Sequence, residues 1–429
     1  MTNLQKPNSI DSEGASQVGR KCIMFTHHIV AERDRVRFGE DVFRRRGYSI
    51  HYVSLWNLLG NEDKPDIETQ NFNAIPNLWK PKTQNEFLDF LDTINPNDFV
   101  ICQVGLWKES VWLHLAMADR GIKYAIMNMG KFPNLQLCRI HSPRHLGRFF
   151  SACTQNTIQL AYRIAAQIRL IRMVGPSYLK LAGPVLEIRG GTYQSPFTYV
   201  FPFPWRSRKI DVEGFELMWA KKAAGSKSVP VQRKYAVFVD GGITGLPDHI
   251  IWDLAYSEDP EPYFAELRKT FDKIERDHGI PIVIALHPKS SYSETEQQAA
   301  FGGRPSFINA TPELIKSSEF VLMHCSTAVS IAVAFRKPIL FLTSKIVRSV
   351  ADMHAIAYLA GWFEQDLIDM NGDAIDQPRK IPIPTPTERV YGRFMRNFLK
   401  ADKVDDRQTW DVVLDAFEEM VNRHQVAAK

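Results

Sequence analysis

The feature that most constrains the fold is a regular alternation of short apolar runs and helix-like segments in the second half of the chain. The runs occupy residues 234–239, 281–286, 306–308, 319–325 and 338–343. Apolar runs of this length that alternate with helices are typical of parallel strands joined by right-handed crossovers. The sequence therefore predicts an α/β domain built on a parallel sheet.

The first half of the chain carries a similar pattern. Apolar runs at 21–26, 48–55, 98–104 and 123–127 are separated by helix-like segments, which predicts a second sheet with helices on both faces. A chain of 429 residues is also too long for one ordinary hydrophobic core. The predicted fold class is α/β, with two Rossmann-like doubly wound domains and a cleft between them.

We place the domain boundaries where these patterns change. Residues 1–20 are polar and predict a disordered tail, and residues 21–230 form the N-terminal domain with a basic helical insertion. Residues 231–385 form the C-terminal domain, and helices within 386–429 pack back across the junction. Inside the insertion we expect a helix over 157–174, a strand near 178–181 and an ordered loop at 196–205.

The tail and the cysteines bear on the compartment. The tail has no apolar core of the kind found in secretory signals, and no apolar run is long enough to cross a bilayer. The cysteines are widely spaced and include no CxxC pair, which argues against disulfides and against a zinc site. We therefore expect a cytoplasmic protein.

The distribution of charge is uneven. The net charge of +5 is modest and does not point to a nucleic-acid partner. Between Asp119 and Glu187, however, there is no acidic residue. Two interpretations stay open: a solvated basic face, or contact with an acidic or lipid-linked glycan or with the inner face of an anionic membrane. The cations of this stretch include Lys131, Arg139, Arg144, Arg148, Arg163, Arg169, Arg172 and Lys180.

Polar side chains follow three of the strands predicted in the second half, at the point where each strand ends. Because the carboxyl ends of parallel strands meet at the same edge of a sheet, we expect these side chains to converge on one site for an anionic substrate. They are Asp240 with Gly241 and Gly242, then His287 with Pro288 and Lys289, then His324 with Ser326 and Thr327.

Each member of this group has a structural and a functional interpretation. Ser326 and Thr327 are predicted to open a helix, where hydroxyls and free N–H groups bind phosphate, although Ser326 is also an ordinary helix cap. His287 is either a structural histidine or a phosphate partner. Pro288 stiffens its turn, and Lys289 adds a positive charge beside it.

The acidic member of the group is Asp240. It is either a turn-forming Asp-Gly residue or a general base that takes a proton from an acceptor hydroxyl. Gly241 and Gly242 behind it would allow close approach of a ligand. Three other carboxylates stay open as the base: Asp248, Asp253 and Glu109.

Further motifs narrow the chemistry. His27 and His28 follow the first strand and are candidates for the acceptor side, since two histidines without a third ligand are poor evidence for a metal. Neither the phosphate-loop pattern nor the dinucleotide pattern GxGxxG is present, and neither is GxSxG or HExxH. We expect neither a bound metal nor a cofactor.

Taken in order, the Asp-Gly-Gly, His-Pro-Lys and Ser-Thr segments resemble the C-terminal domain of bacterial surface-carbohydrate glycosyltransferases of GT-B fold. More narrowly they resemble the CMP-ulosonate group, which includes sialyltransferases, polysialyltransferases and β-Kdo transferases. The resemblance covers about residues 234–344. It implies that His287, Ser326 and Thr327 contact the CMP phosphate. The acidic motif of that group is only partly present, because Val239 stands where a second acidic residue is expected.

The resemblance implies an inverting, metal-independent transfer of an ulosonic acid, such as Kdo or sialic acid, from a CMP donor to a bacterial capsule or lipopolysaccharide glycan. Residues 21–230 would then bind the acceptor and residues 231–385 the nucleotide sugar. Other functions stay open: a transferase that uses a UDP-sugar or CDP-polyol donor, a nucleotide-sugar epimerase, or a non-catalytic glycan- or nucleotide-binding protein.

Overall fold

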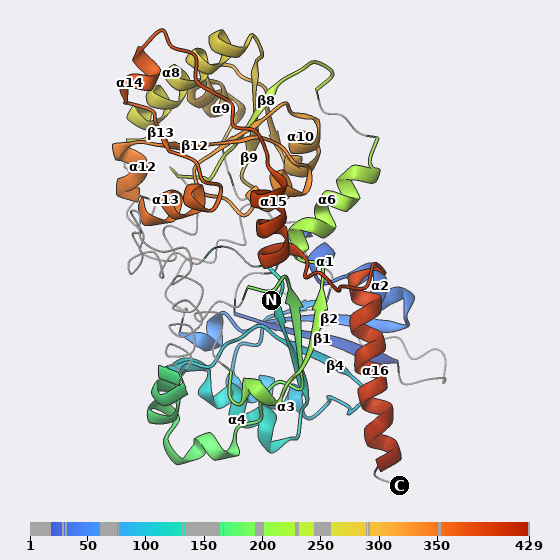
Figure 1. Ribbon diagram of the computed structural model, residues 1–429. Helices are drawn as coiled ribbons and strands as arrows, with labels where there is room; N and C mark the ends of the chain where they lie inside the picture. The colour runs from blue at the N-terminus through green and yellow to red at the C-terminus, as the bar shows by residue number, and fades with distance from the viewer. Residues whose placement is uncertain are drawn as a thin grey trace, which may run out of the picture.

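The computed structural model describes residues 19–27, 30, 32–60, 75, 77–130, 133, 164–165, 167–193, 201–227, 231–243, 259–288, 290, 292–350 and 353–427. Two α/β units lie one above the other in Figure 1, and each contains one parallel sheet. The predicted fold class, α/β with two Rossmann-like sheets, is confirmed.

The first unit is built on a seven-stranded sheet in the order β3-β2-β1-β4-β5-β6-β7, in which every neighbouring pair is parallel. Side chains of β1 alternate between the two faces: Cys22 and Met24 enter one buried cluster, and Ile23 and Phe25 enter another. Both faces are therefore covered. The strands are β1 (Arg20–Thr26), β2 (Tyr48–Ser54), β3 (Leu78–Trp79), β4 (Phe99–Cys102), β5 (Tyr124–Asn128), β6 (Leu186–Gly190) and β7 (Arg208–Val212).

The second unit is built on a six-stranded sheet in the order β10-β9-β8-β11-β12-β13, again with only parallel pairs. Val237 and Val239 of its central strand face one core, and Ala236 and Phe238 face the other. The strands are β8 (Ala236–Val239), β9 (Ile282–Leu286), β10 (Ser306–Ile308), β11 (Val321–Met323), β12 (Ile339–Thr343) and β13 (Ile368–Asp369).

Helices pack on both sides of the two sheets. Those of the first unit are α1 (Glu32–Arg37), α2 (Glu40–Arg45), α3 (Gln84–Leu91) and α4 (Val111–Asp119), with the 3-10 turns η1 (Asn57–Leu59), η3 (Lys108–Ser110), η5 (Gly175–Lys180) and η6 (Pro204–Arg206). Those that pack on the second unit are α6 (Phe215–Gly225), α8 (Glu261–His278), α9 (Glu294–Phe301), α10 (Thr311–Ser317), α11 (Val329–Ala334), α12 (Lys345–Val350), α13 (Met353–Trp362), α14 (Asp373–Asp376), α15 (Glu388–Phe394) and the π-helical η7 (Met395–Leu399).

The chain crosses between the units twice, and the two crossings touch. The first leads from β7 into α6, whose Leu217 and Ala220 join the core of the second unit. The second leads from η7 to α16 (Thr409–Ala427), which returns to the first unit. The Gly214 N–H donates to the Leu399 carbonyl at 2.7 Å, which joins the two crossings directly.

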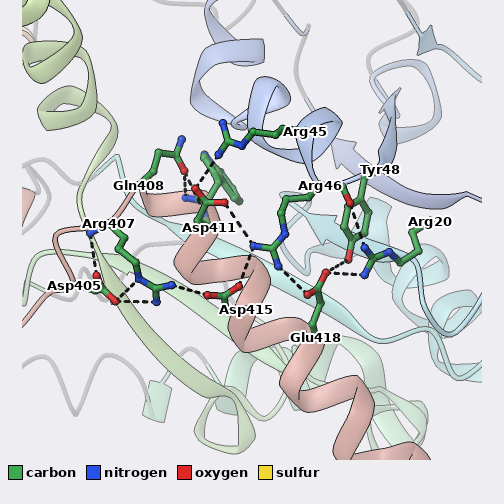
Figure 2. A network of polar contacts seen from close by, with 11 residues as sticks. Arg20, Arg45, Arg46, Tyr48, Asp405, Arg407, Gln408, Asp411, Asp415 and Glu418 are labelled. Carbon is green, nitrogen blue, oxygen red and sulfur yellow. Dashed lines mark hydrogen bonds and ion pairs between the residues drawn. The ribbon is translucent and has the colours of Figure 1, made fainter.

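The last helix, α16, completes the core of the first unit. Trp410 is fully buried there, its ring packs at a tilt against Phe43, and its Nε1 donates to the Arg37 carbonyl at 2.9 Å. Figure 2 shows the polar network along the same helix, in which Arg46 bonds to Asp415 at 3.0 Å and to Glu418 at 2.8 Å. The helix is thus held to the first unit by an aromatic anchor and by charged bonds.

Several local predictions differ from the structure. The strand expected near 178–181 is wrong, because Gly175 and Pro176 begin the 3-10 turn η5. The helix expected to open at Ser326 begins three residues later, at Val329. The strands β3, β6, β7 and β13 and the helix α6 were not predicted, because their apolar residues are few or do not follow a clear period.

Some predictions lie outside the described residues. These are most of the tail at 1–20, most of the basic insertion at 131–163, and the residues His28, Lys289, Asp248 and Asp253. Within the described parts of the chain, no helix combines the length and the apolar character needed to span a bilayer.

A substitution at Gly39 tests how tightly Trp410 packs against this position. This glycine has φ +65°, and a Cβ placed on it would lie 2.0 Å from the Trp410 ring. Gly39→Ala should lower the free energy of unfolding by about 1 kcal/mol for the left-handed backbone and by a further 1–3 kcal/mol for overpacking. Gly121→Ala is the matched control, since Gly121 has φ +63° and no neighbour within 4 Å. Equal losses in urea unfolding of the two variants would contradict the role assigned to Trp410.

Candidate functional site

The second sheet brings the predicted site residues to one edge. Its strand order reverses between β8 and β11, and in parallel sheets ligands bind beyond the carboxyl ends at such a reversal. Asp240 follows β8, His287 follows β9, and Ser326 lies shortly after β11. Because β9, β8 and β11 are consecutive neighbours in the sheet, the three turns lie side by side.

Asp240 links two of these turns. Its carboxylate is 3% exposed and accepts the Gly242 N–H at 2.9 Å. It also accepts the backbone N–H of His287 and, more weakly, the Ser290 hydroxyl at 3.4 Å. Burial raises the pKa of this carboxyl above its usual value, and the hydrogen bonds act against that rise. The geometry suits a residue that fixes the His287 turn better than one that reaches out to an acceptor hydroxyl.

His287 is half-buried and lies on the turn that Asp240 holds. Its carbonyl accepts the Ser290 N–H at 2.8 Å, which closes a tight turn through the exposed Pro288. With its own N–H held by Asp240, both backbone polar groups of His287 are fixed within the turn. A histidine on a fixed turn at a strand end is suited to contact a phosphate or to move a proton.

Ser326 and Thr327 lie in the turn after β11. The Ser326 hydroxyl accepts the Ala328 N–H at 3.2 Å, so it caps a local turn, and Thr327 is exposed. This turn lies close to the Asp-Gly-Gly turn, because an ideal Cβ on Gly241 would be 3.8 Å from the Cys325 carbonyl. Gly242 has φ +65°, which favours glycine at that position.

His324 occupies a different place from the one predicted. The ring is 1% exposed; Nδ1 donates to the Leu342 carbonyl at 2.8 Å, and Nε2 accepts the Tyr263 hydroxyl at 3.0 Å. The carbonyl can only accept, which assigns the proton to Nδ1. Both nitrogens are therefore used inside the unit, and the prediction that His324 binds the donor phosphate is corrected to a structural role.

The first sheet has its own reversal, between β1 and β4, where His27 and Gln103 follow the two strands. Nδ1 of His27 donates to the Gln103 carbonyl at 3.1 Å, and its ring packs edge-on against Trp107. Burial lowers the pKa of His27. The alternative base Glu109 is exposed in the turn η3 of this unit.

Sequence reasoning missed residues that support these turns. Tyr263 holds His324 from α8, and burial beside the Asp240 charge raises the pKa of its hydroxyl. Ser290 and Gln103 also went unnoticed; Nε2 of Gln103 is buried and has no hydrogen-bond partner within the described part of the chain. Of these residues, only Ser290 could have been found from the sequence, because it lies in the turn that follows His287. Among the described residues, no group of three His, Cys, Asp or Glu side chains is placed to hold a metal ion.

Comparisons with known proteins give structural similarities at low identity. No protein-family model matches the chain, and no curated protein matches it significantly. The calicheamicin glycosyltransferase CalG4 is 14% identical, with a TM-score of 0.39, over 96% of this chain and 98% of that one. The wall teichoic acid polymerase TagF is 11% identical, with a TM-score of 0.47, over 94% and 90%.

A third similar structure is the UDP-GlcNAc 2-epimerase from Methanocaldococcus jannaschii, 11% identical with a TM-score of 0.41 over 88% of this chain and 98% of that one. The reported neighbours are thus a glycosyltransferase, a wall teichoic acid polymerase and a nucleotide-sugar epimerase. Similarities of this size do not assign an activity to the chain.

Two buried histidines predict how stability depends on pH. Burial lowers the pKa of His324 to about 4 and that of His114 to about 4, from an ordinary value of 6.5. The unfolded chain then binds more protons between pH 6.5 and pH 4, so stability falls as the pH falls through this window. Each histidine contributes a loss of up to about 3 kcal/mol.

We expect His324→Gln to flatten this dependence, because glutamine can donate to Leu342 and accept from Tyr263 without titrating. The measurement is the urea concentration at the midpoint of unfolding, taken at several pH values between 4 and 6.5. His114→Gln is the corresponding variant in the first unit. The double variant should show the smallest change of this midpoint with pH. If the midpoint of the double variant depended on pH as strongly as that of the unchanged protein, the two histidines would not be buried as neutral rings.

Proposed function

We propose that the chain is a glycosyltransferase that binds a nucleotide sugar at the carboxyl edge of β8, β9 and β11. The observation that carries the proposal is the convergence of three turns at the strand-order reversal, joined by the bonds of Asp240 to Gly242, His287 and Ser290. A site of this kind offers an imidazole, hydroxyls and close backbone approach to a phosphate.

The proposed donor is a CMP-linked ulosonic acid such as Kdo or sialic acid. The order of the Asp-Gly-Gly, His-Pro and Ser-Thr segments along adjacent strand ends supports this donor class. The acceptor is a bacterial surface glycan, either an oligosaccharide or a lipid-linked one, and it would approach from the first unit, where His27 lies at the corresponding reversal. Reaction at the predicted cleft would invert the anomeric centre.

In this reaction the acceptor hydroxyl oxygen forms a bond to the anomeric carbon, and the bond from that carbon to the phosphate oxygen of CMP breaks. The acceptor proton passes to a base, and the phosphate keeps the electron pair of the broken bond. His287, Ser326 and Thr327 would stabilise the charge that grows on the phosphate. Asp240 would hold the His287 turn in place, which makes it a positioning residue. To act as the catalytic base instead, its buried carboxylate would have to reach the acceptor hydroxyl.

The test is calorimetric titration of the full chain with CMP, CDP, UMP and UDP. We expect selective CMP binding that weakens at least about tenfold in His287→Ala, the size of one lost charge-assisted hydrogen bond. His51→Ala is the control, because His51 lies on β2 of the first unit, far along the chain from the site strands. A preference for UDP or CDP would replace the proposed CMP-linked donor by a UDP-sugar or a CDP-polyol. The absence of any nucleotide binding would overturn the proposed site.

A second variant separates the two roles of Asp240. If Asp240 positions the His287 turn, Asp240→Asn should weaken CMP binding and lower turnover together, and Ser290→Ala should do the same to a smaller extent. Turnover is measured with CMP-Kdo and CMP-sialic acid as donors. Loss of kcat with unchanged CMP affinity would instead identify Asp240 as the base and refute the positioning role.

A further inference from the structure

Exposed apolar side chains gather on one surface of the first unit. Of the large apolar side chains that are exposed in the described chain, all but Ile308 lie between residues 164 and 205. Leu179 is 83% exposed and Trp205 is 62% exposed. The set is Ile164, Ile168, Ile171, Met173, Leu179 and Trp205, and we call it the apolar surface.

Part of this surface is a helical stripe. Residues 164–165 and 167–174 are helical, and Ile164, Ile168 and Ile171 are spaced four and three residues apart, so they share one face. Leu170 is buried in a small cluster with Tyr178. The helix therefore packs through a different face and leaves the isoleucines outward.

The remaining members are tied to this helix by contacts. The Tyr178 hydroxyl donates to Gln167 at 2.9 Å, and the Tyr178 ring packs on Phe203 with centroids 4.9 Å apart. Phe203 in turn meets the ring of Trp205 edge-on. Through these contacts Leu179 and Trp205 are connected to the helix.

Cations accompany the apolar side chains. Arg169 and Arg172 are exposed on the same helix, Lys180 is exposed next to Leu179, and Arg206 is exposed next to Trp205. No acidic residue occurs between Asp119 and Glu187 to balance them. Outward isoleucines, an exposed tryptophan and flanking cations are the combination found on proteins that lie on anionic bilayers.

We propose that the apolar surface, with its flanking cations, docks the protein onto the face of a membrane that contains anionic lipid. The apolar side chains would enter the boundary between headgroups and acyl chains, and the arginines and lysines would pair with lipid phosphates. A stretch of chain that carries cations and no acidic residue between Asp119 and Glu187, beside outward apolar side chains, matches a uniformly anionic lipid surface. The inference rests on surface features and does not depend on the proposed glycosyl transfer.

Vesicle flotation with the purified full chain tests the proposal. We expect binding to vesicles of phosphatidylcholine mixed with phosphatidylglycerol, and weaker binding to phosphatidylcholine alone. Raising the salt from about 0.1 M to about 1 M should release most of the protein, because the charges are then screened within about 3 Å.

Two variants locate the contact. Ile168→Ser with Ile171→Ser and Leu179→Ser removes apolar contacts, and Arg169→Gln with Arg172→Gln and Lys180→Gln removes charge. Each set should weaken binding about tenfold or more. The matched control is Ile308→Ser with Arg276→Gln and Lys345→Gln, which changes an exposed apolar residue and two exposed cations of the second unit.

Three outcomes would overturn the proposal. The first is no binding to either vesicle at low salt, and the second is binding that neither surface variant weakens. The third is a change of oligomeric state in the apolar variant without any vesicle binding, which would make the surface an interface between proteins. Because flotation needs neither donor nor acceptor, failure here leaves the nucleotide titration of His287→Ala unaffected.

Discussion

The return of the last helix to the first unit is the constraint on which the rest of the structure depends. Trp410 of α16 fills a space in the first core that only a glycine at position 39 leaves open. The chain must therefore cross between the units twice, and the contact of Gly214 with Leu399 joins the two crossings. The two units are thus joined at these two adjacent connections, and the charged face of α16 holds that helix to the first unit.

In the second unit, buried polar groups that bond to neighbouring residues determine the geometry of the site. The Asp240 carboxylate and the His324 ring are both buried at the carboxyl edge, but each uses its polar atoms on the protein itself. The residues that remain candidates for ligand contact are then those on the turns that Asp240 joins, which include the half-buried His287. Because hydrogen bonds hold both backbone polar groups of His287 in the turn, this part of the edge is already ordered before a ligand binds.

The sequence predicted the parallel sheets well because strands such as 281–286 and 338–343 are continuous apolar runs buried on both faces. It failed where the period was weak: β6 places Glu187 and Arg189 between its buried residues, and these charges find partners in Asn128 and Asp211. The convergence of Asp240, His287 and Ser326 followed from topology alone. The inward orientation of His324 did not, because it depends on Tyr263 and Leu342, which no local pattern connects to it.

The position of α16 also determines the order in which the molecule is completed as it is synthesised. The first unit leaves the ribosome before the second, yet the part of its core that receives Trp410, Leu414 and Phe417 stays open until α16 has been made. The second unit, whose core ends with η7, has all its elements earlier. The unit translated first is therefore the one finished last, and until then its exposed apolar face is the part of the nascent chain most in need of protection from aggregation.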